Sequence, residues 1–146
     1  MSGTSWWLLI CLYWHMMTRN AFEPSVKPVR WIGSSKEDLS AFPTDARLHI
    51  GGALWDAQIG MKSPWAKPLK GFGGAGVLEI LADVDGNTFR AVYTVRVAEA
   101  VYVLHAFQKK SRRGIATPKA EVDLIAARLA RAKEDYEQWL RNRASL

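Results

Sequence analysis

The sequence predicts a small α+β domain with the element order β-α-α-β-β-β-α, in which helices pack on one side of an antiparallel sheet. Three observations support this fold class. The 146 residues are 49% apolar, which is enough for one hydrophobic core. Strand-like apolar runs are concentrated in the second half of the chain, and apolar residues at helical spacing flank them on both sides. We therefore expect one domain over residues 29–146, with an N-terminal helix pair and a C-terminal helix.

The first predicted strand, at residues 29–32, precedes two predicted helices. Ser34, three residues before Glu37, fits a capping box that opens the first helix. Pro43 ends this helix and can open the second one, which ends at Gly60. The second helix carries an apolar stripe at helical spacing, formed by Ala46, Ile50, Leu54 and Ala57. We expect this stripe to face the core.

Three predicted strands then follow one another, with the sequences VLEILAD at 77–83, TFRAVYTVRV at 88–97 and VYVLHAF at 101–107. All three are rich in β-branched and aromatic residues. Asp85 and Gly86, between the first two strands, are a strong hairpin signal. Because strands joined by short connections usually pair with each other, we expect an antiparallel meander.

A last helix is predicted to begin at Thr117 and Pro118, which fit the N-cap and the first helical position. Its apolar face has helical spacing and consists of Val122, Ile125, Leu129, Ala132, Tyr136 and Trp139. We expect this face to pack on the core and the charged residues of the helix to face solvent.

The sequence predicts neither a cofactor nor a metal site. Residues 71–76 match the G-x-G-x-x-G pattern, but they lead into a strand, whereas a dinucleotide site must open a helix. The three histidines are scattered, and no Cys/His/Asp cluster has the spacing of metal ligands. Cys11 is the single cysteine, so no internal disulfide is expected and a cytoplasmic location is predicted.

Residues 1–28 are predicted to be an extension outside the domain. They include the apolar run WWLLICLYWHMM, which is shorter than the ~20 residues that a bilayer-spanning helix needs. The run lacks signal-peptide features, because the preceding MSGTS is neutral and Arg19 follows the run. We interpret the segment as a start codon assigned too early, with Met16 or Met17 as the true start, or as a disordered extension. A membrane or partner-binding segment is the alternative.

Positive charge is concentrated in two segments of the chain. The formal net charge is +6 and the pI is about 9.7, which favours nucleic acid, an anionic membrane or an acidic protein as partner. No acidic residue lies within either segment. The first segment carries Lys62, Lys67 and Lys70, and the second carries Lys109, Lys110, Arg112, Arg113 and Lys119. Because the second segment directly follows a strand, we expect it to form an anion-binding edge of the sheet.

Four blocks of the chain form an ordered series: SPWAKPLKGFG, LEI, FRAVYTV and VLHAFQKKSRRGIATPKAEVDLIAAR. Their order and residues resemble the patterns K-x-L-x-G, E-L-R, R-V-x-Y and L-h-x-F-x-K-K…T-P. These patterns belong to the phage-derived Gp49-like branch of the HigB/RelE toxins, in the RelE/ParE superfamily of type II toxin–antitoxin systems. The resemblance extends over residues 29–139 and implies a RelE-like fold. It also implies a ribosome-associated mRNA endoribonuclease that inhibits translation, with a helix-turn-helix (HigA-like) antitoxin as partner.

One position departs from the family pattern. The arginine of E-L-R is replaced by Leu81, so one positive charge of that strand is missing. Arg96, Arg112 or Arg113 can compensate for it in our interpretation. The departure keeps an alternative open, because the resemblance also covers ParE-like toxins, which inhibit DNA gyrase without cleaving RNA, and other nucleic-acid-binding modules. Fold alone does not choose between these functions.

The resemblance and the charge pattern together give a set of candidate site residues. RNA cleavage through the 2′-OH needs groups that move two protons, and positive charge at the phosphorane-like transition state. Arginine stays charged and offers phosphate a planar fork. The predicted catalytic residues are Arg90, Lys109 and Lys110; the predicted RNA-binding residues are Lys67, Lys70, Arg112 and Arg113; Glu79 and His105 are predicted to support them.

Several of these residues have a purely structural alternative. Arg90 alternates with inward-facing residues of its strand and points to the other face, where it can simply pair with Glu79. Lys67 and Lys70 can belong to a solvated loop. For His105, the alternative is a hydrogen-bonded core residue. It is in phase with the apolar positions of its own strand, Val101, Val103 and Phe107.

Overall fold

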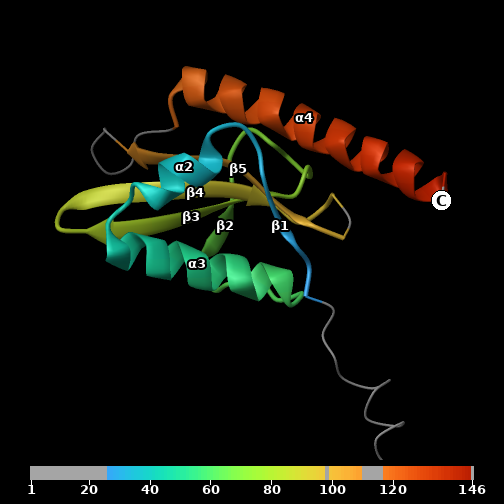
Figure 1. The fold of residues 1–146 in the computed structure, drawn as a ribbon. Helices are drawn as coiled ribbons and strands as arrows, with labels where there is room; N and C mark the ends of the chain where they lie inside the picture. The colour runs from blue at the N-terminus through green and yellow to red at the C-terminus, as the bar shows by residue number, and fades with distance from the viewer. Residues whose placement is uncertain (1–25, 98, 110–116, 146) are drawn as a thin grey trace, which may run out of the picture.

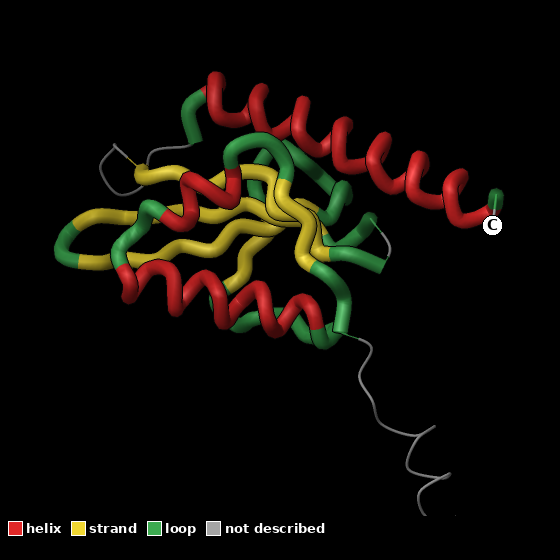
Figure 2. Tube along the Cα trace, in the orientation of Figure 1, coloured by secondary structure: helices red, strands yellow, loops and turns green. Residues whose placement is uncertain are grey.

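The computed structural model of the chain describes residues 26–97, 99–109 and 117–145, so the predicted extension lies almost wholly outside the described residues. The described strands are β1 (Val29–Trp31), β2 (Ala66–Pro68), β3 (Val77–Val84), β4 (Asn87–Thr94) and β5 (Val101–Lys109). The described helices are α2 (Ser35–Ser40), α3 (Thr44–Gln58) and α4 (Lys119–Ala144). Figures 1 and 2 show that the strands form one sheet and that the helices pack against it. The α+β class is therefore confirmed.

The sheet has five strands in the order β1-β5-β4-β3-β2 and is mixed. Strands β2 to β5 pair antiparallel, as the meander prediction requires, but β1 pairs parallel with β5. The expectation of a purely antiparallel sheet is therefore wrong at β1. The rule of short connections does not apply to this strand, because two helices and three strands lie between β1 and β5 in the chain.

Strand β2 was not expected, because the basic segment around it has the composition of a loop. It is only three residues long and contains Pro68. Proline is tolerated at a sheet edge, where its missing N–H faces no partner strand. The β3–β4 hairpin, in contrast, is confirmed: Asp85 and Gly86 have φ values of 50° and 79°, the left-handed pair that a two-residue type I′ turn needs.

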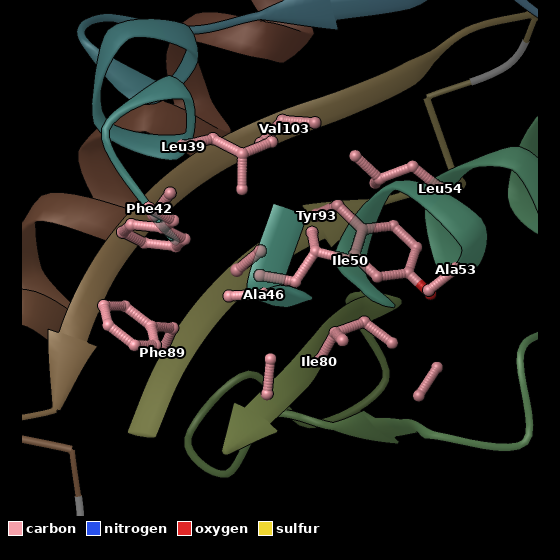
Figure 3. Close-up of a cluster of buried hydrophobic side chains, with 14 of the residues drawn as sticks. Leu39, Phe42, Ala46, Ile50, Ala53, Leu54, Ile80, Phe89, Tyr93 and Val103 are labelled. Carbon is pink, nitrogen blue, oxygen red and sulfur yellow. The ribbon is translucent and has the colours of Figure 1, made fainter. Parts of the chain in front are cut away.

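Helices cover both faces of the sheet, so the expectation that they pack on one side is wrong (Figure 1). Strand β4 has apolar residues at odd and even positions, and a strand that is apolar on both faces must be covered on both. Helices α2 and α3 cover one face through the predicted stripe of α3, and the Phe42 and Phe89 rings meet there with centroids 4.9 Å apart (Figure 3).

Helix α4 covers the opposite face with Ile125, Leu129 and Ala132, which are buried against Tyr102 and Leu104 of β5. The predicted apolar face of this helix is therefore confirmed as core at its middle, while Tyr136 and Trp139 are only half-buried. In the part of the chain that the structure describes, none of the helices combines the length and the apolar content needed to cross a bilayer.

A β-bulge changes the phase of β5. Val92 of β4 pairs with His105, but the next residue, Tyr93, pairs with Val103, so Leu104 is an extra residue on β5. As a result, Val103 faces α2 and α3, whereas Leu104 and His105 both lie on the α4 side. The expected phase of His105 with Val101 and Val103 is therefore wrong, because a bulge interrupts the period of two on which it was based.

Candidate functional site

Arg90 of β4 is a buried arginine, 5% exposed, on the α4 side of the sheet. Its Nη1 lies 3.2 Å from Glu79 Oε2 of β3 and donates a hydrogen bond to Thr117 Oγ1, just before α4. Its guanidinium carbon lies 5.7 Å from the centroid of the Phe107 ring of β5. Residues from three different segments therefore fix the position of one cation.

The pair between Arg90 and Glu79 was predicted as the structural alternative, and the structure contains it. The pair has ion-pair distance without the alignment of a hydrogen bond. Glu79 Oε2 and Arg90 Nε are both buried, and neither has a hydrogen-bond partner among the described residues. An unpartnered buried donor costs free energy, and a binding or catalytic role is one reason for a protein to keep it.

The register of the sheet places two of the predicted lysines near Arg90. Lys67 of β2 is directly opposite Glu79, and Lys109 of β5 is opposite Thr88, two positions from Arg90 on β4. Both lysines therefore lie on the same face of the sheet as Arg90. We call this group the Arg90 site, and it consists of Lys67, Glu79, Arg90, Phe107, Lys109 and Thr117.

The other predicted cations are not part of this arrangement. Lys70 is exposed in the loop beyond β2. The predicted residues Lys110, Arg112 and Arg113 lie outside the described residues. In the ranges that are described, no carboxylate lies within ion-pair distance of the lysines at 67, 70 and 109. Among the described residues, Arg90 is therefore paired with Glu79, whereas the charges of these three lysines have no carboxylate partner.

Both ring nitrogens of His105 are used by α4. Arg128 Nη1 lies 3.1 Å from His105 Nδ1, and because arginine only donates, Nδ1 is the acceptor. The proton is then on Nε2, which donates to Glu121 Oε2. The His105 ring also stacks on Phe107, with centroids 4.7 Å apart. The residue is buried and hydrogen-bonded, and it supports from behind the ring that Arg90 contacts.

Sequence reasoning missed Thr117 and Phe107 as partners of Arg90. Thr117 was expected to cap α4, but the N-cap position is Pro118, the helix begins at Lys119, and no side chain caps it. The hydroxyl of Thr117 instead accepts a hydrogen bond from Arg90, 27 positions away in sequence. Local spacing carries no signal for such a contact. Phe107 could have been found from the resemblance, since it belongs to the same block as Lys109.

The two tyrosines of the sheet core are not acid–base groups at neutral pH. Burial, helped by Asp56, raises the pKa of Tyr93 to about 12. Burial and the hydrogen bond to Asp135, 2.8 Å long, raise the pKa of Tyr102 to about 12 as well. Across residues 26–97, 99–109 and 117–145, no three His, Cys, Asp or Glu side chains gather as metal ligands would.

The fold and the site together define a small α+β module with a buried arginine and with Lys67 and Lys109 on the same face of the sheet. The family model described as phage-derived protein Gp49-like (DUF891) matches residues 37–130, more than half of the chain. The chain therefore belongs to the Gp49-like family, as the four sequence blocks predicted. This family is known as a RelE/HigB-like toxin family, so the chain is a toxin-like module of the toxin–antitoxin type. No curated protein and no solved structure matches the chain.

Proposed function

We propose that this protein is the toxin of a type II toxin–antitoxin system and that it cleaves mRNA at the ribosome, which inhibits translation. The observation that carries the proposal is the buried Arg90, held by Glu79, Phe107 and Thr117 with its Nε unpartnered among the described residues. We assign the activity to residues 29–146, with the cytoplasm as its location and a helix-turn-helix (HigA-like) antitoxin as its partner.

In the proposed mechanism, Arg90 stabilises the transition state. Cleavage through the 2′-OH moves negative charge onto the nonbridging phosphate oxygens, and a fixed guanidinium in a poorly hydrated place stabilises that charge strongly. Glu79 orients the guanidinium and keeps it buried while no RNA is bound. A phosphate that reaches Arg90 supplies the acceptor that Nε lacks.

Lysines provide the rest of the proposed chemistry. Lys109 lies at the end of β5, on the same face of the sheet as Arg90. We propose that Lys109 and Lys110 transfer the protons during cleavage. Lys67 and Lys70, with Arg112 and Arg113, are proposed to hold the RNA backbone by charge. His105 is proposed as a positioning residue rather than a general acid, because both of its ring nitrogens are engaged by α4.

One observation favours a second candidate function. Leu81 is directly opposite Arg90 in the sheet, so the arginine that the family pattern has there would have stood beside it. A site with one arginine fewer is weaker as a catalyst. A ParE-like inhibitor of DNA gyrase, which does not cleave RNA, is therefore the alternative, with the cationic surface as its binding face.

Induction of the protein in bacterial cells separates the two functions. Bulk protein synthesis, DNA synthesis and the integrity of a reporter mRNA are measured at intervals after induction. The endoribonuclease predicts that translation stops first and that the reporter mRNA is cut. Arrest of DNA synthesis with intact mRNA would instead support the gyrase-directed alternative.

A further inference from the structure

A groove of about 470 Å³ lies at the open edge of β3, next to the Arg90 site. Strand β2 pairs only with residues 78–80 of β3, so residues 81–84 have no neighbouring strand on that side in the described part of the chain. Trp65, Lys67 and Asp83 line this groove together with Asp45 and His49 of α3. The proposed mechanism uses only Lys67 of these residues.

Trp65 is the unusual residue of the groove. A large aromatic side chain is normally buried, yet Trp65 is 65% exposed. Its backbone is anchored, because the Trp65 N–H donates to Ser63 Oγ, 3.3 Å away, and Ser63 is itself buried. The His49 ring lies beside it, with centroids 5.7 Å apart. The chain therefore holds an aromatic face in the solvent at the mouth of a groove.

The groove also contains hydrogen-bond acceptors in a fixed position. Thr88 Oγ1 donates to Asp83 Oδ1 at 2.6 Å, which orients the carboxylate and leaves its second oxygen available. A flat aromatic face, a nearby cation and an oriented carboxylate are the groups that bind a nucleobase, its phosphate and its exocyclic amino group.

The groove adjoins the place where cleavage is proposed. Leu81 lines the groove and is directly opposite Arg90, and Lys67 is opposite the Glu79 that pairs with Arg90. Two strand spacings, about 10 Å, separate β2 from β4. The groove reaches from His49 of α3 around the open edge of β3 to Leu81 on the Arg90 face, so a single-stranded RNA that passes around this edge can contact both places.

We propose that this groove is a nucleobase subsite, in which Trp65 stacks on a base next to the scissile phosphate and Asp83 selects a base with an exocyclic amino group. The inference rests on the proposed endoribonuclease function and deepens it. Cytosine, adenine and guanine each offer Asp83 an exocyclic amino donor, whereas uracil has carbonyl oxygens and no amino group. The subsite therefore favours these bases over uracil.

The test uses the full-length chain and short single strands of C, A or U with 2′-O-methyl sugars, which cannot be cleaved through the 2′-OH. Affinity is measured by fluorescence anisotropy. Trp65→Ala is expected to weaken binding about 5- to 150-fold, the range for loss of one stacked base, and Trp65→Phe is expected to retain most of the affinity. Trp55→Ala, which removes an exposed tryptophan of α3, is the matched control and should bind as the original chain does.

Asp83→Asn tests the selection step. Asparagine keeps the shape of the side chain but can donate as well as accept, so uracil becomes acceptable. The preference for C and A over U is expected to decrease by at least about threefold, with less change in overall affinity.

The outcomes separate the subsite from the function on which it rests. If Trp65→Ala binds the strands as tightly as the unchanged protein, or if it loses no more than Trp55→Ala, the subsite is overturned while RNA cleavage can still hold. If the unchanged protein binds none of the strands and cuts no mRNA, the proposed function has failed first. Unchanged RNA affinity with altered self-association in light scattering would make the groove a protein-binding edge instead, which also overturns the proposal.

Discussion

The two faces of the sheet use the same strands for different purposes. The face under α2 and α3 is apolar where those helices cover it, and its core includes Ile50, Ile80 and Tyr93. The face under α4 is apolar only where Ile125 and Leu129 cover it, and beyond the start of the helix it carries the Arg90 site. Because side chains alternate along a strand, one set of residues stabilises the domain while the other can carry charge. The predictions below test how far these two roles are separate.

The largest effect is expected at Arg90. Arg90→Ala removes the proposed transition-state contact, so mRNA cleavage should decrease about 100- to 1000-fold. The variant should also lose about 3 kcal/mol of stability, because Glu79, whose side chain is 15% exposed, is left buried without its partner. Cleavage of a reporter mRNA and urea unfolding of the purified protein measure the two effects.

A double variant separates catalysis from stability. Arg90→Ala combined with Glu79→Ala removes both charges, so much of the stability should return while cleavage stays lost. If the double variant regains cleavage, Arg90 is an ion-pair residue of the sheet and not part of an active site. If the single variant is both stable and active, the proposed role of the buried arginine is wrong.

Substitutions on the face covered by α2 and α3 should change the stability of the protein but not its cleavage activity. Ile80→Ala removes a fully buried side chain between the sheet and α3, and a change of this kind costs about 2 to 5 kcal/mol. Leu48→Ala on the outer surface of α3, where the side chain is 69% exposed, should change stability by less than about 0.5 kcal/mol. Denaturant midpoints compare the two variants, and cleavage per folded molecule should be unchanged in both. A specific loss of cleavage in folded Ile80→Ala would show that the two faces are coupled.

Two buried tyrosines, one on each face, give a smaller contrast. The hydroxyl of Tyr102 on the α4 side donates to Asp135, whereas the hydroxyl of Tyr93 on the α3 side has no hydrogen-bond partner among the described residues. Tyr102→Phe should therefore cost about 1 kcal/mol at neutral pH, and Tyr93→Phe should cost almost nothing. Thermal melts of the two variants measure the difference, and equal destabilisation would contradict this account.

The raised pKa values of the same two tyrosines predict that the free energy of unfolding decreases at alkaline pH. Both have a folded-state pKa raised from 10.0 to about 12, so both favour the neutral hydroxyl more in the folded state than in the unfolded state. Their contribution is complete below pH 10 and is lost as the pH increases toward 12. By pH 11, one unit above the unfolded value, the loss should be about 1 kcal/mol for each tyrosine. Urea unfolding between pH 8 and 11 should show it, and Tyr93→Phe should show about half the decrease.

The elements that were predicted correctly are those whose signal is local. The stripe of α3 and the Asp85-Gly86 hairpin depend on residues a few positions apart. The parallel pairing of β1, the bulge at Leu104 and the covering of both faces depend on partners far away in the chain. The face of Arg90 followed from alternation on its own strand. Its contact with Thr117 could not be predicted, because it requires knowing where α4 begins in space.

The smallest effect is expected from the exposed lysines of the first basic segment, and it should appear in the salt dependence rather than in stability. Lys67→Ala with Lys70→Ala removes up to two phosphate contacts, and each contact contributes about 0.7 to 0.9 to the slope of log K against log salt. The slope for single-stranded RNA should therefore become shallower by about 1 to 2, while the melting temperature stays the same. Lys62→Ala is the control, because this lysine is exposed in the same segment but is not one of the predicted RNA-binding residues.

If the double variant keeps the original slope, the two lysines face solvent in the complex, and RNA is held by Lys109 and the residues that follow it. If Lys62→Ala changes the slope as much as the double variant does, the charge of the segment acts as a diffuse field and the side of the sheet on which Lys67 lies has no special importance.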